Sequence, residues 1–505
     1  MDRRVTPRAI VGLSIAAACL AAAGCAMEED WTYGDDQAEV NYKLNALEFP
    51  NPRGTARTFT DNPHTSLKRG DVQSEPFFQA LGVNGRTCGH CHLPDEGWTI
   101  TPALVQRRFT HPLDLSDPDC LVDAKTCGAE PDPEQYGMDP IFRTVDGSNS
   151  PLADVSTPAA REAAYSMLLS KAVIRVGIGI PAGAEFELTA VDDPYGFASA
   201  AELSLFRRPL PSSNLRLSPV DGDPEVPILT GVMWDGRLAG PGKDILEALL
   251  DQAEGATLGH AQATAGLSPG QRQRIVRFET GLHTAQSRDK LAGNLRSVGG
   301  RGGPDWLAAN QDFYLGINDV LVGDYQTGAP FDPDVFTIFN GWRTSTDPAR
   351  ARIARGQTLF NRKPIAITGV GGLNDVLDVE VIPGTCSSCH DAPNYGHHSV
   401  PLPIDIGVAD GALRTPDLPL YTLRNRTTGE TVETSDPGRA LITGRWADIG
   451  KFKGPILRGL AARPPYFHNG MAATVEDVIE FYDQRFGIGF TPAEKADLAA
   501  FLLAL

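Results

Sequence analysis

The stretch "TCGHCH" at residues 87–92 returns as "TCSSCH" at residues 385–390. Each copy has two cysteines separated by two residues and followed directly by a histidine, which is the signature of covalent c-type haem attachment. Two thiols at this spacing form thioethers with one porphyrin, and the adjacent histidine ligates its iron. A zinc site or a redox-active thiol pair would leave the histidine after each pair unexplained. The sequence therefore predicts two haem c groups, attached through Cys88, Cys91, Cys386 and Cys389 and ligated by His92 and His390.

The composition fits a globular protein of two or more domains. The chain has 505 residues, of which 41% are apolar and 21% charged, and its formal net charge is −18. An acidic chain argues against nucleic acid or anionic lipid as the main partner, because like charges repel. The same charge suits a basic protein partner.

The first 25 residues have the pattern of an export signal. Three arginines within the first eight residues precede an apolar run at 9–24, which is too short for a membrane span. The run ends in "AAGC", which resembles a lipoprotein cleavage box with Cys25 as the lipidated residue. Ala22 stands where leucine is usual, so simple signal cleavage remains an alternative. We expect a periplasmic protein whose only membrane attachment is a lipid anchor.

Two cysteines, Cys120 and Cys127, belong neither to the haem motifs nor to the signal. They stand seven residues apart in a loop rich in aspartate and proline. Because exported proteins enter an oxidising compartment, we expect a local disulfide between them. Two free thiols are the alternative.

The two motif histidines lie 298 residues apart, which is too far for one small cytochrome domain. We therefore expect a mainly α fold with two cytochrome c-like haem domains, long irregular loops and inserted segments. The expected order is a signal peptide at 1–25, a linker at 26–60, an N-terminal haem domain at 61–340 and a C-terminal cytochrome c domain at 341–505.

Helical periodicity and capping residues indicate the expected elements. The C-terminal domain is expected to contain helices at 347–361, 474–486 and 491–505, the last with Thr491 and Glu494 as its capping box. The N-terminal domain is expected to contain helices at 158–168, 243–255 and 268–286, and short strands at 172–180 and 185–191.

The second axial ligand decides what each haem does. A haem with both axial positions filled carries electrons, whereas one with an open position can react with a small molecule. The candidates for this ligand in the C-terminal domain are Met471, His397, His398, His468 and Tyr482. The N-terminal domain shows no well-placed second ligand. Four residues could be considered, but all lie in segments without a recognised motif: Met138, Met167, His111 and His64. The N-terminal haem is therefore expected to be the open one.

The segment "KFKGPILRGLAARPPYFHNGMAATVEDVIEFYDQRF" at 451–486 resembles the C-terminal signature of bacterial di-haem cytochrome c peroxidases and of the related enzyme MauG. In that family the second ligand of the C-terminal haem lies 14 residues after the histidine of this motif, which is His468 here and leads to Tyr482. The peroxidases have methionine at that position and MauG has tyrosine. The resemblance thus implies that Tyr482, rather than Met471, ligates the second iron. It also implies that Arg458 binds a haem propionate.

Two further segments resemble the same family. "VMWDGR" at 232–237 matches a motif whose tryptophan lies between the haems, which implies that Trp234 conducts electrons. "LDQAEGATLGHAQA" at 250–263 matches the segment that leads to an acidic residue over the reactive haem, and that position falls at Gln262. Glutamine cannot move a proton between the two oxygens of a peroxide, whereas His260 can. Gln262 is a candidate catalytic residue because of its position in the motif, and His260 is one because of its chemistry.

The resemblance implies reduction of hydrogen peroxide at the N-terminal haem, with electrons relayed through the C-terminal haem from a donor cytochrome or cupredoxin. It also implies a calcium ion between the domains, whose ligands the sequence does not place. Arg207 or Arg208 is expected to bind haem propionates. Two alternatives remain. One is a MauG-like or oxygenase-like oxidation of an organic or protein substrate, and the other is a plain di-haem electron-transfer cytochrome.

Overall fold

The computed structural model describes residues 46–505 apart from residues 69, 118–119, 121–123, 125–126, 128–130, 222–229, 241 and 310–312. The predicted signal at 1–25, with Cys25, lies outside the described residues. The described residues, from 46 to 505, belong to one compact unit. The division at residue 340 between two haem domains therefore stays a prediction.

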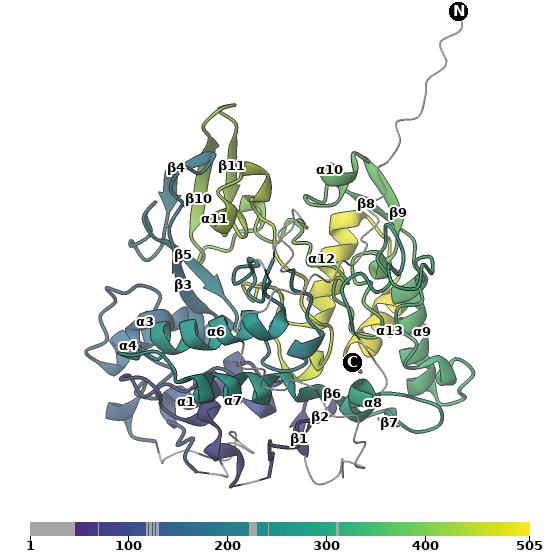
Figure 1. Ribbon diagram of the computed structural model, residues 1–505, viewed down its shortest axis with the longest axis horizontal. Helices are drawn as coiled ribbons and strands as arrows, with labels where there is room; N and C mark the ends of the chain where they lie inside the picture. The colour runs from purple at the N-terminus through teal and green to yellow at the C-terminus, as the bar shows by residue number, and fades with distance from the viewer. Residues whose placement is uncertain are drawn as a thin grey trace, which may run out of the picture. The chain divides into compact units, whose positions relative to one another are not determined.

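Helices form much of the described chain (Figure 1). Those before residue 310 are α1 (Pro102–Thr110), α3 (Thr144–Gly147), α4 (Pro158–Ala164), α5 (Ser166–Lys171), α6 (Ile245–Gly259), α7 (Pro269–Thr280) and α8 (Pro304–Ala309). Those after it are α9 (Pro348–Arg362), α10 (Asn374–Leu377), α11 (Ala440–Thr443), α12 (Val475–Phe486) and α13 (Pro492–Leu502). Helix α13 packs along α9 and also contacts α12, and α9 contacts the turn Cys386–Ser388 of the second haem motif.

The described strands pair in four small antiparallel sheets. The first sheet has the order β1 (Ala46–Asn51), β2 (Gly54–Thr60), β6 (Leu282–Asp289) and β7 (Gly293–Asn294). The others are β11 (Thr431–Thr434) with β10 (Leu420–Asn425) and β4 (Phe186–Asp192), β3 (Ile174–Ile178) with β5 (Leu203–Arg207), and β8 (Ile365–Thr368) with β9 (Val381–Gly384). The expectation of a mainly α fold is therefore met only in part.

Residues 46–60, expected as the end of a linker, instead form the β1–β2 hairpin. Alternate residues of β1 are buried, as are the last three residues of β2, and Phe49 and Phe59 are almost completely inaccessible to solvent. Strand β2 pairs with β6 from more than 200 residues later in the chain. A short segment whose partner is so distant gives only a weak strand pattern, which explains why the sequence did not indicate it.

The three helices expected in the C-terminal domain are confirmed as α9, α12 and α13. The Thr491 hydroxyl accepts a hydrogen bond from the backbone N–H of Glu494, and the Glu494 carboxylate accepts one from the backbone N–H of Thr491. The expected capping box is therefore present at the start of α13.

Two helices expected in the N-terminal domain differ from the observed ones. The helix expected at 158–168 breaks at Tyr165 into α4 and α5, and the helix expected at 268–286 ends as α7 at Thr280. Strand β6 begins two residues later because Leu282–Asp289 pairs with β2. The expected strands at 172–180 and 185–191 are confirmed as β3 and β4, and the helix expected at 243–255 as α6.

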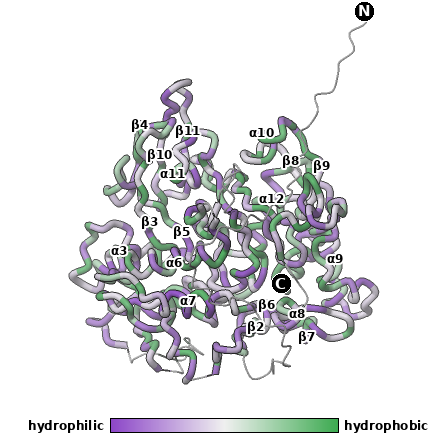
Figure 2. Tube along the Cα trace, in the orientation of Figure 1, coloured by the Kyte–Doolittle hydropathy of each residue, from purple (hydrophilic) through white to green (hydrophobic). Residues whose placement is uncertain are grey.

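Hydrophobic and hydrophilic residues alternate along most of the trace (Figure 2). Within the part of the chain that the structure describes, no helix combines the length and the hydropathy that crossing a membrane requires.

The largest hydrophobic cluster gathers α9, α12 and α13 around buried aromatic residues such as Phe336 and Phe501. A second cluster, which includes Phe77, Trp98 and Phe278, lies beside the first haem motif. Each motif is therefore supported by its own core.

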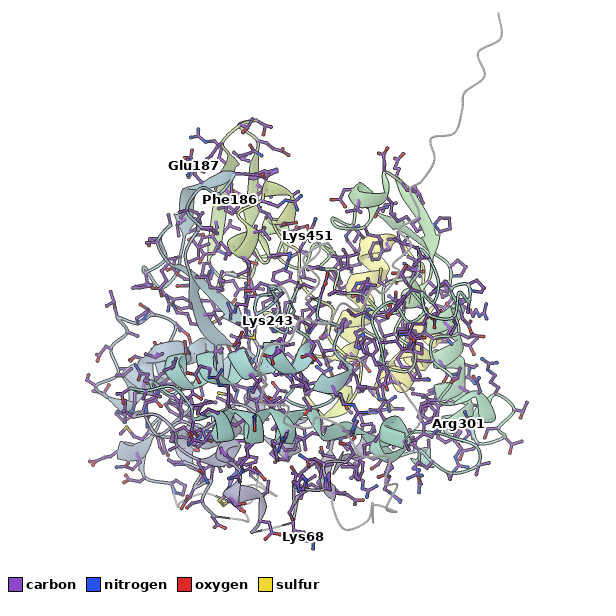
Figure 3. All side chains as sticks on the ribbon, in the orientation of Figure 1. Lys68, Phe186, Glu187, Lys243, Arg301 and Lys451 are labelled. Atoms are coloured by element: carbon purple, nitrogen blue, oxygen red, sulfur yellow. A yellow bond between two sulfur atoms is a disulfide. The ribbon has the colours of Figure 1, made fainter. Side chains whose placement is uncertain are left out.

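The sheet of β4, β10 and β11 lies apart from both motifs in sequence. Figure 3 labels two neighbouring residues of β4, Phe186 and Glu187, whose environments differ. Phe186 is fully buried, whereas the Glu187 carboxylate pairs with Arg424 and Arg426 at the surface.

The expected disulfide between Cys120 and Cys127 is also present.

Candidate functional site

Both haem-attachment motifs fold in the same way. Cys88–His90 and Cys386–Ser388 form single 3-10 turns. In each motif the backbone N–H of the final histidine, His92 or His390, donates a hydrogen bond of 3.0 Å to the carbonyl oxygen of the first cysteine. This tight turn brings both thiols and the imidazole to the wall of one cavity, as attachment of a single porphyrin requires.

The motif histidines are both anchored through Nδ1. His92 Nδ1 lies 3.0 Å from the carbonyl oxygen of Trp98, and His390 Nδ1 lies 2.6 Å from that of Gly396. Because a carbonyl oxygen only accepts hydrogen bonds, Nδ1 carries the proton and Nε2 keeps its lone pair for a metal. Burial lowers the pKa of His92 to about 4 and also lowers the pKa of His390. Both imidazoles are therefore neutral at pH 7, as metal ligands must be.

His90, the other histidine of the first motif, has a structural role. Its Nδ1 accepts a hydrogen bond of 3.0 Å from the backbone N–H of Thr87. Burial lowers the pKa of His90 to about 3, so the ring is neutral and fully committed to shaping the turn.

We call the cavity that contains the second motif the C-terminal cavity. Its wall includes Cys386, Cys389, His390 and Tyr482, together with apolar side chains from β8, α12 and α13. Neither thiol forms a disulfide. An apolar cavity with two free thiols and a neutral histidine on its wall fits haem c.

Cations at the C-terminal cavity fit the carboxylates of a haem. Arg208, Lys453 and Arg463 line it, and burial without a matching anion lowers the pKa of Lys453 to about 8. Arg458 follows Leu457 of the wall and is buried, and its Nε and Nη2 have no hydrogen-bond partner among the described residues. A buried guanidinium with two unused donors needs an anion, and a propionate supplies one. Arg458 itself is absent from the wall of this cavity, so its role in binding a propionate stays a prediction.

The structure separates the candidates for the second axial ligand. Tyr482 lines the C-terminal cavity, whereas Met471 does not and packs instead in a cluster with Phe452. Both ring nitrogens of His397 are engaged with backbone carbonyls, those of His398 and Leu217. His398 and His468 do line the cavity. Burial, with the two motif thiols as smaller contributors, raises the pKa of the Tyr482 hydroxyl.

We call the cavity that contains the first motif the N-terminal cavity. Its wall includes Cys88, Cys91 and His92, and apolar residues from α6 and α7. Four residues of this half of the chain were candidates for the second axial ligand, and none of them lies on this wall: Met138, Met167, His111 and His64. Met167 is buried in a separate cluster and Met138 is exposed. Among the described residues, only His260 on this wall offers a second imidazole.

Trp234 lines both cavities. Its indole Nε1 donates a hydrogen bond of 2.8 Å to the carbonyl oxygen of Arg208, and its ring lies edge to face with His468 at a centroid distance of 6.3 Å. The structure thus places Trp234 between the two motifs, where the sequence resemblance expected it.

Arg207 lines the N-terminal cavity, but its guanidinium is already paired with buried carboxylates. Its guanidinium forms a two-pronged pair with Asp436, at 2.7 and 2.9 Å, and a third bond of 2.5 Å with Asp235. All three residues are buried. Because Asp235 directly follows Trp234, this ion cluster fixes the segment that holds the indole. Both arginines expected to bind propionates line a cavity, and Arg208, which lines both cavities and donates to backbone carbonyls rather than to a carboxylate, is the better placed of the two.

The structure also separates His260 from Gln262. His260 lines the N-terminal cavity, but Gln262 is exposed, is absent from the wall, and accepts a hydrogen bond from Asn84. The cause is the end of α6 at Gly259, after which the chain turns outward and Gln262 adopts a positive φ of 54°. The expectation of a catalytic Gln262 is therefore not supported by its position.

Two carboxylates on this wall were not expected from the sequence. Asp146 lies 114 residues before His260, and its Oδ2 lies 2.7 Å from His260 Nδ1. Glu279, in α7, is buried, and burial raises its pKa to about 8. Neither belongs to a motif. Only the fold brings them to the cavity, so sequence pattern alone carried no signal for them.

The described residues give no support to a calcium ion. The only group of potential metal ligands among them is Asp117 with Cys120 and Cys127, and these two cysteines form the disulfide. Calcium therefore remains an implication of the family resemblance alone.

No family model matches the chain. Over 226 residues the chain is 31% identical to the cytochrome-c peroxidase IdrP1 of Pseudomonas sp. (strain SCT), covering 40% of this chain and 51% of that protein. Over 135 residues it is 33% identical to the cytochrome-c peroxidase IdrP2 of Denitromonas iodatirespirans, covering 24% of this chain and 36% of that protein. Among solved structures, a MauG-like protein associated with microbial copper homeostasis aligns over 88% of this chain and 91% of its own, with 16% identity and a TM-score of 0.30.

The sequence relatives confirm the resemblance to the cytochrome c peroxidases. The matched regions span about half or less of the length of these relatives.

Proposed function

We propose that this chain, which is similar to cytochrome c peroxidases, is a di-haem c-type oxidoreductase that reduces hydrogen peroxide at its N-terminal cavity. Electrons reach that cavity from the C-terminal one. The observation that carries the proposal is the position of Trp234, whose side chain lines both cavities. A tryptophan that conducts electrons between the two cavities is needed only if the two sites act together.

The haem groups supply redox-active iron when they are bound. The chain holds one in each cavity through two cysteines and a neutral histidine, His92 or His390. Arg458, Arg208 and Arg463 supply the positive charge that the propionates require.

The N-terminal cavity has the groups for peroxide chemistry. Besides the haem-attachment motif, its wall carries Met233 and His260, and the Nδ1 of His260 is engaged by Asp146. In this proposal neither of them ligates the iron, which would leave one position open to a small molecule. Hydrogen peroxide, two electrons and two protons give two molecules of water. His260 can take the proton from one peroxide oxygen and return it to the other as the O–O bond breaks.

The C-terminal cavity has the groups for storing and relaying an electron. Tyr482 on its wall is the proposed second ligand to the iron that His390 holds. With both positions filled this site does not bind peroxide, and it passes electrons onward through Trp234.

The setting of the proposed reaction is the periplasm, with a lipid anchor at Cys25. The electron donor is a small one-electron carrier, a cytochrome or a cupredoxin. The net charge of −18 favours a donor with a basic surface, because opposite charges accelerate encounter.

A second candidate function is the oxidation of an organic or protein substrate, as the resemblance to MauG implies. It is favoured by Tyr482, because tyrosine rather than methionine lines the C-terminal cavity. A plain electron-transfer cytochrome is disfavoured, because such a protein has two filled axial positions at each iron.

The test is to add hydrogen peroxide to the reduced holoprotein with a reduced cytochrome c as donor. Rapid reoxidation of both haems with continued donor turnover is the expected result. Reoxidation without donor turnover would replace the proposal by the MauG-like function. No reaction, with both irons low-spin, would leave an electron carrier.

A further inference from the structure

The carboxylate of Asp146 and the imidazole of His260 form a pair on the wall of the N-terminal cavity. Asp146 Oδ2 and His260 Nδ1 lie 2.7 Å apart, and both residues line the cavity together with Cys91. We propose that Asp146 is a positioning residue, which holds His260 so that its Nε2 accepts a proton from a ligand entering the cavity. The inference rests on the proposed function and names the group that performs its proton transfer.

The hydrogen bond decides which ring nitrogen is available. An ionised carboxylate only accepts hydrogen bonds, so His260 Nδ1 carries a proton, and in the neutral ring the lone pair is then on Nε2. Burial opposes ionisation of Asp146, but the bond from His260 and the charge of Arg86 hold the pKa of its carboxyl below the usual value. A histidine fixed in this tautomer acts as a proton acceptor through Nε2.

Three contacts fix the pair in place. Arg86 Nη1 lies 3.5 Å from Asp146 Oδ2 and 3.3 Å from the carbonyl oxygen of His260, to which it donates a hydrogen bond. Asn84 Nδ2 donates another of 2.8 Å to the same carbonyl. Asn84 and Arg86 directly precede the first haem motif, so the segment that leads to Cys88 also fixes the backbone of His260.

The backbone of Asp146 is held in an uncommon conformation. Its φ is 60°, in the left-handed region that non-glycine residues seldom adopt. Arg86 stabilises the preceding loop by donating hydrogen bonds to the carbonyl oxygens of Pro140 and Ile141. A constrained aspartate whose carboxylate points at a cavity-lining histidine fits a residue kept for orientation.

His260 Nε2 takes a proton from one oxygen of hydrogen peroxide and gives it to the other as the O–O bond breaks, so His260 ends neutral and the transfer consumes no proton. The two electrons come from two molecules of the reduced one-electron carrier of the proposed function, and the two protons that complete the second water come from solvent. His260 is about 42% exposed and therefore in contact with solvent.

Glu279 is the competing proton acceptor on the same wall. Its carboxyl is buried, and burial raises its pKa to about 8, so it holds its proton at neutral pH and is a poor acceptor there. Arg237 and His92 also face the cavity, but a guanidinium has no lone pair to offer and His92 is committed to the iron.

The experiment measures cyanide binding to the oxidised holoprotein and carbon monoxide binding to the reduced one. Hydrogen cyanide must lose its proton to bind, whereas carbon monoxide has none. Asp146→Asn is the informative variant, because asparagine has the same shape and tolerates the left-handed backbone but cannot fix the histidine tautomer. Asp251→Asn is the control, since Asp251 lies on α6, pairs with Lys243 and is absent from the cavity wall.

We expect Asp146→Asn and His260→Gln to slow cyanide association by about tenfold or more, since general acid–base catalysis typically contributes about 10²–10⁴-fold. Carbon monoxide binding and the Asp251→Asn variant should match the wild type. If Asp146→Asn binds cyanide at the wild-type rate, Asp146 has no positioning role. If Glu279→Gln alone slows cyanide, the acceptor is Glu279 and the inference is wrong. A wild type that binds neither ligand would instead overturn the proposed function, because the N-terminal iron would then have two protein ligands.

Discussion

The indole Nε1 of Trp234 donates a hydrogen bond of 2.8 Å to the carbonyl oxygen of Arg208, and both residues line both cavities. The segment is held on each side. The backbone N–H of Arg208 donates to the carbonyl oxygen of His468 at 2.6 Å, and that of Lys453 donates to the carbonyl oxygen of Trp234 at 2.9 Å. The wall between the two sites is therefore a rigid element with an oxidisable ring in it.

Trp234→Phe should slow electron transfer between the haems. Phenylalanine keeps an aromatic ring in the space but is much harder to oxidise and lacks the N–H that bonds to Arg208. We expect donor-linked peroxide turnover to fall by about tenfold or more, equal to about 1.4 kcal/mol in activation free energy. Absorption spectra should show both haems unchanged.

Trp446→Phe is the matched control for this prediction. Trp446 packs in the cluster of β4, β5 and β10 and lines neither cavity. Its turnover should equal that of the wild type. Equal turnover in Trp234→Phe as well would mean that electrons take another path.

Tyr482→Phe should change the spectrum of the C-terminal haem, because the variant loses the only oxygen through which this side chain can bind iron. Met471→Leu should leave that spectrum unchanged, since Met471 is absent from the C-terminal cavity. Magnetic circular dichroism of the oxidised holoprotein distinguishes the ligand sets. The reverse pattern, with only Met471→Leu altered, would make Met471 the ligand.

Arg207→Met should destabilise the fold strongly. The change leaves the buried carboxylate of Asp436 without its arginine partner and that of Asp235 with Arg237 alone. Removing one partner of a buried ion pair costs about 3–5 kcal/mol. Arg362→Met is the control, because its pair with Asp334 is exposed and should contribute only about 0–1 kcal/mol. Urea unfolding of both variants followed by circular dichroism compares the two losses, and equal losses would contradict the assignment.

Glu279 should make stability depend on pH. Its folded pKa of about 8 lies above the value of about 4.3 for an unfolded glutamate, so between these values the folded state keeps a proton that the unfolded state has lost. The contribution of Glu279 is therefore present at low pH and is lost as pH rises toward about 8. Relative to the wild type, Glu279→Gln should become steadily more stable across this window. A stability difference that does not change with pH, measured from urea midpoints, would show that Glu279 is not buried as a neutral acid.

How much of this fold could be predicted depends on the range of the contacts. Helices such as α13 depend on local signals, a capping box and an apolar face, and were correctly expected. Strand β6 depends on its pairing with β2, so its residues were assigned to a helix. The β1–β2 hairpin was missed for the same reason.

The residues of the candidate site also differ in how far the sequence could predict them. The attachment cysteines, His92 and His390 follow from covalent spacing, and Trp234 follows from a motif resemblance that the geometry supports. Asp146 and Glu279 reach the N-terminal cavity only because α3 and α7 fold against it. Gln262 was matched to the family only by its position in the motif. The turn at the end of α6 places it outside the cavity, so the match in position did not predict its location.

The central claim is that the N-terminal iron has an open position and the C-terminal iron does not. Electron paramagnetic resonance of the fully oxidised holoprotein tests it most directly, because this measurement counts high-spin and low-spin iron separately. The account predicts one high-spin signal, from the iron held by His92, and one low-spin signal, from the iron held by His390 and Tyr482. Two low-spin signals of equal weight would contradict it.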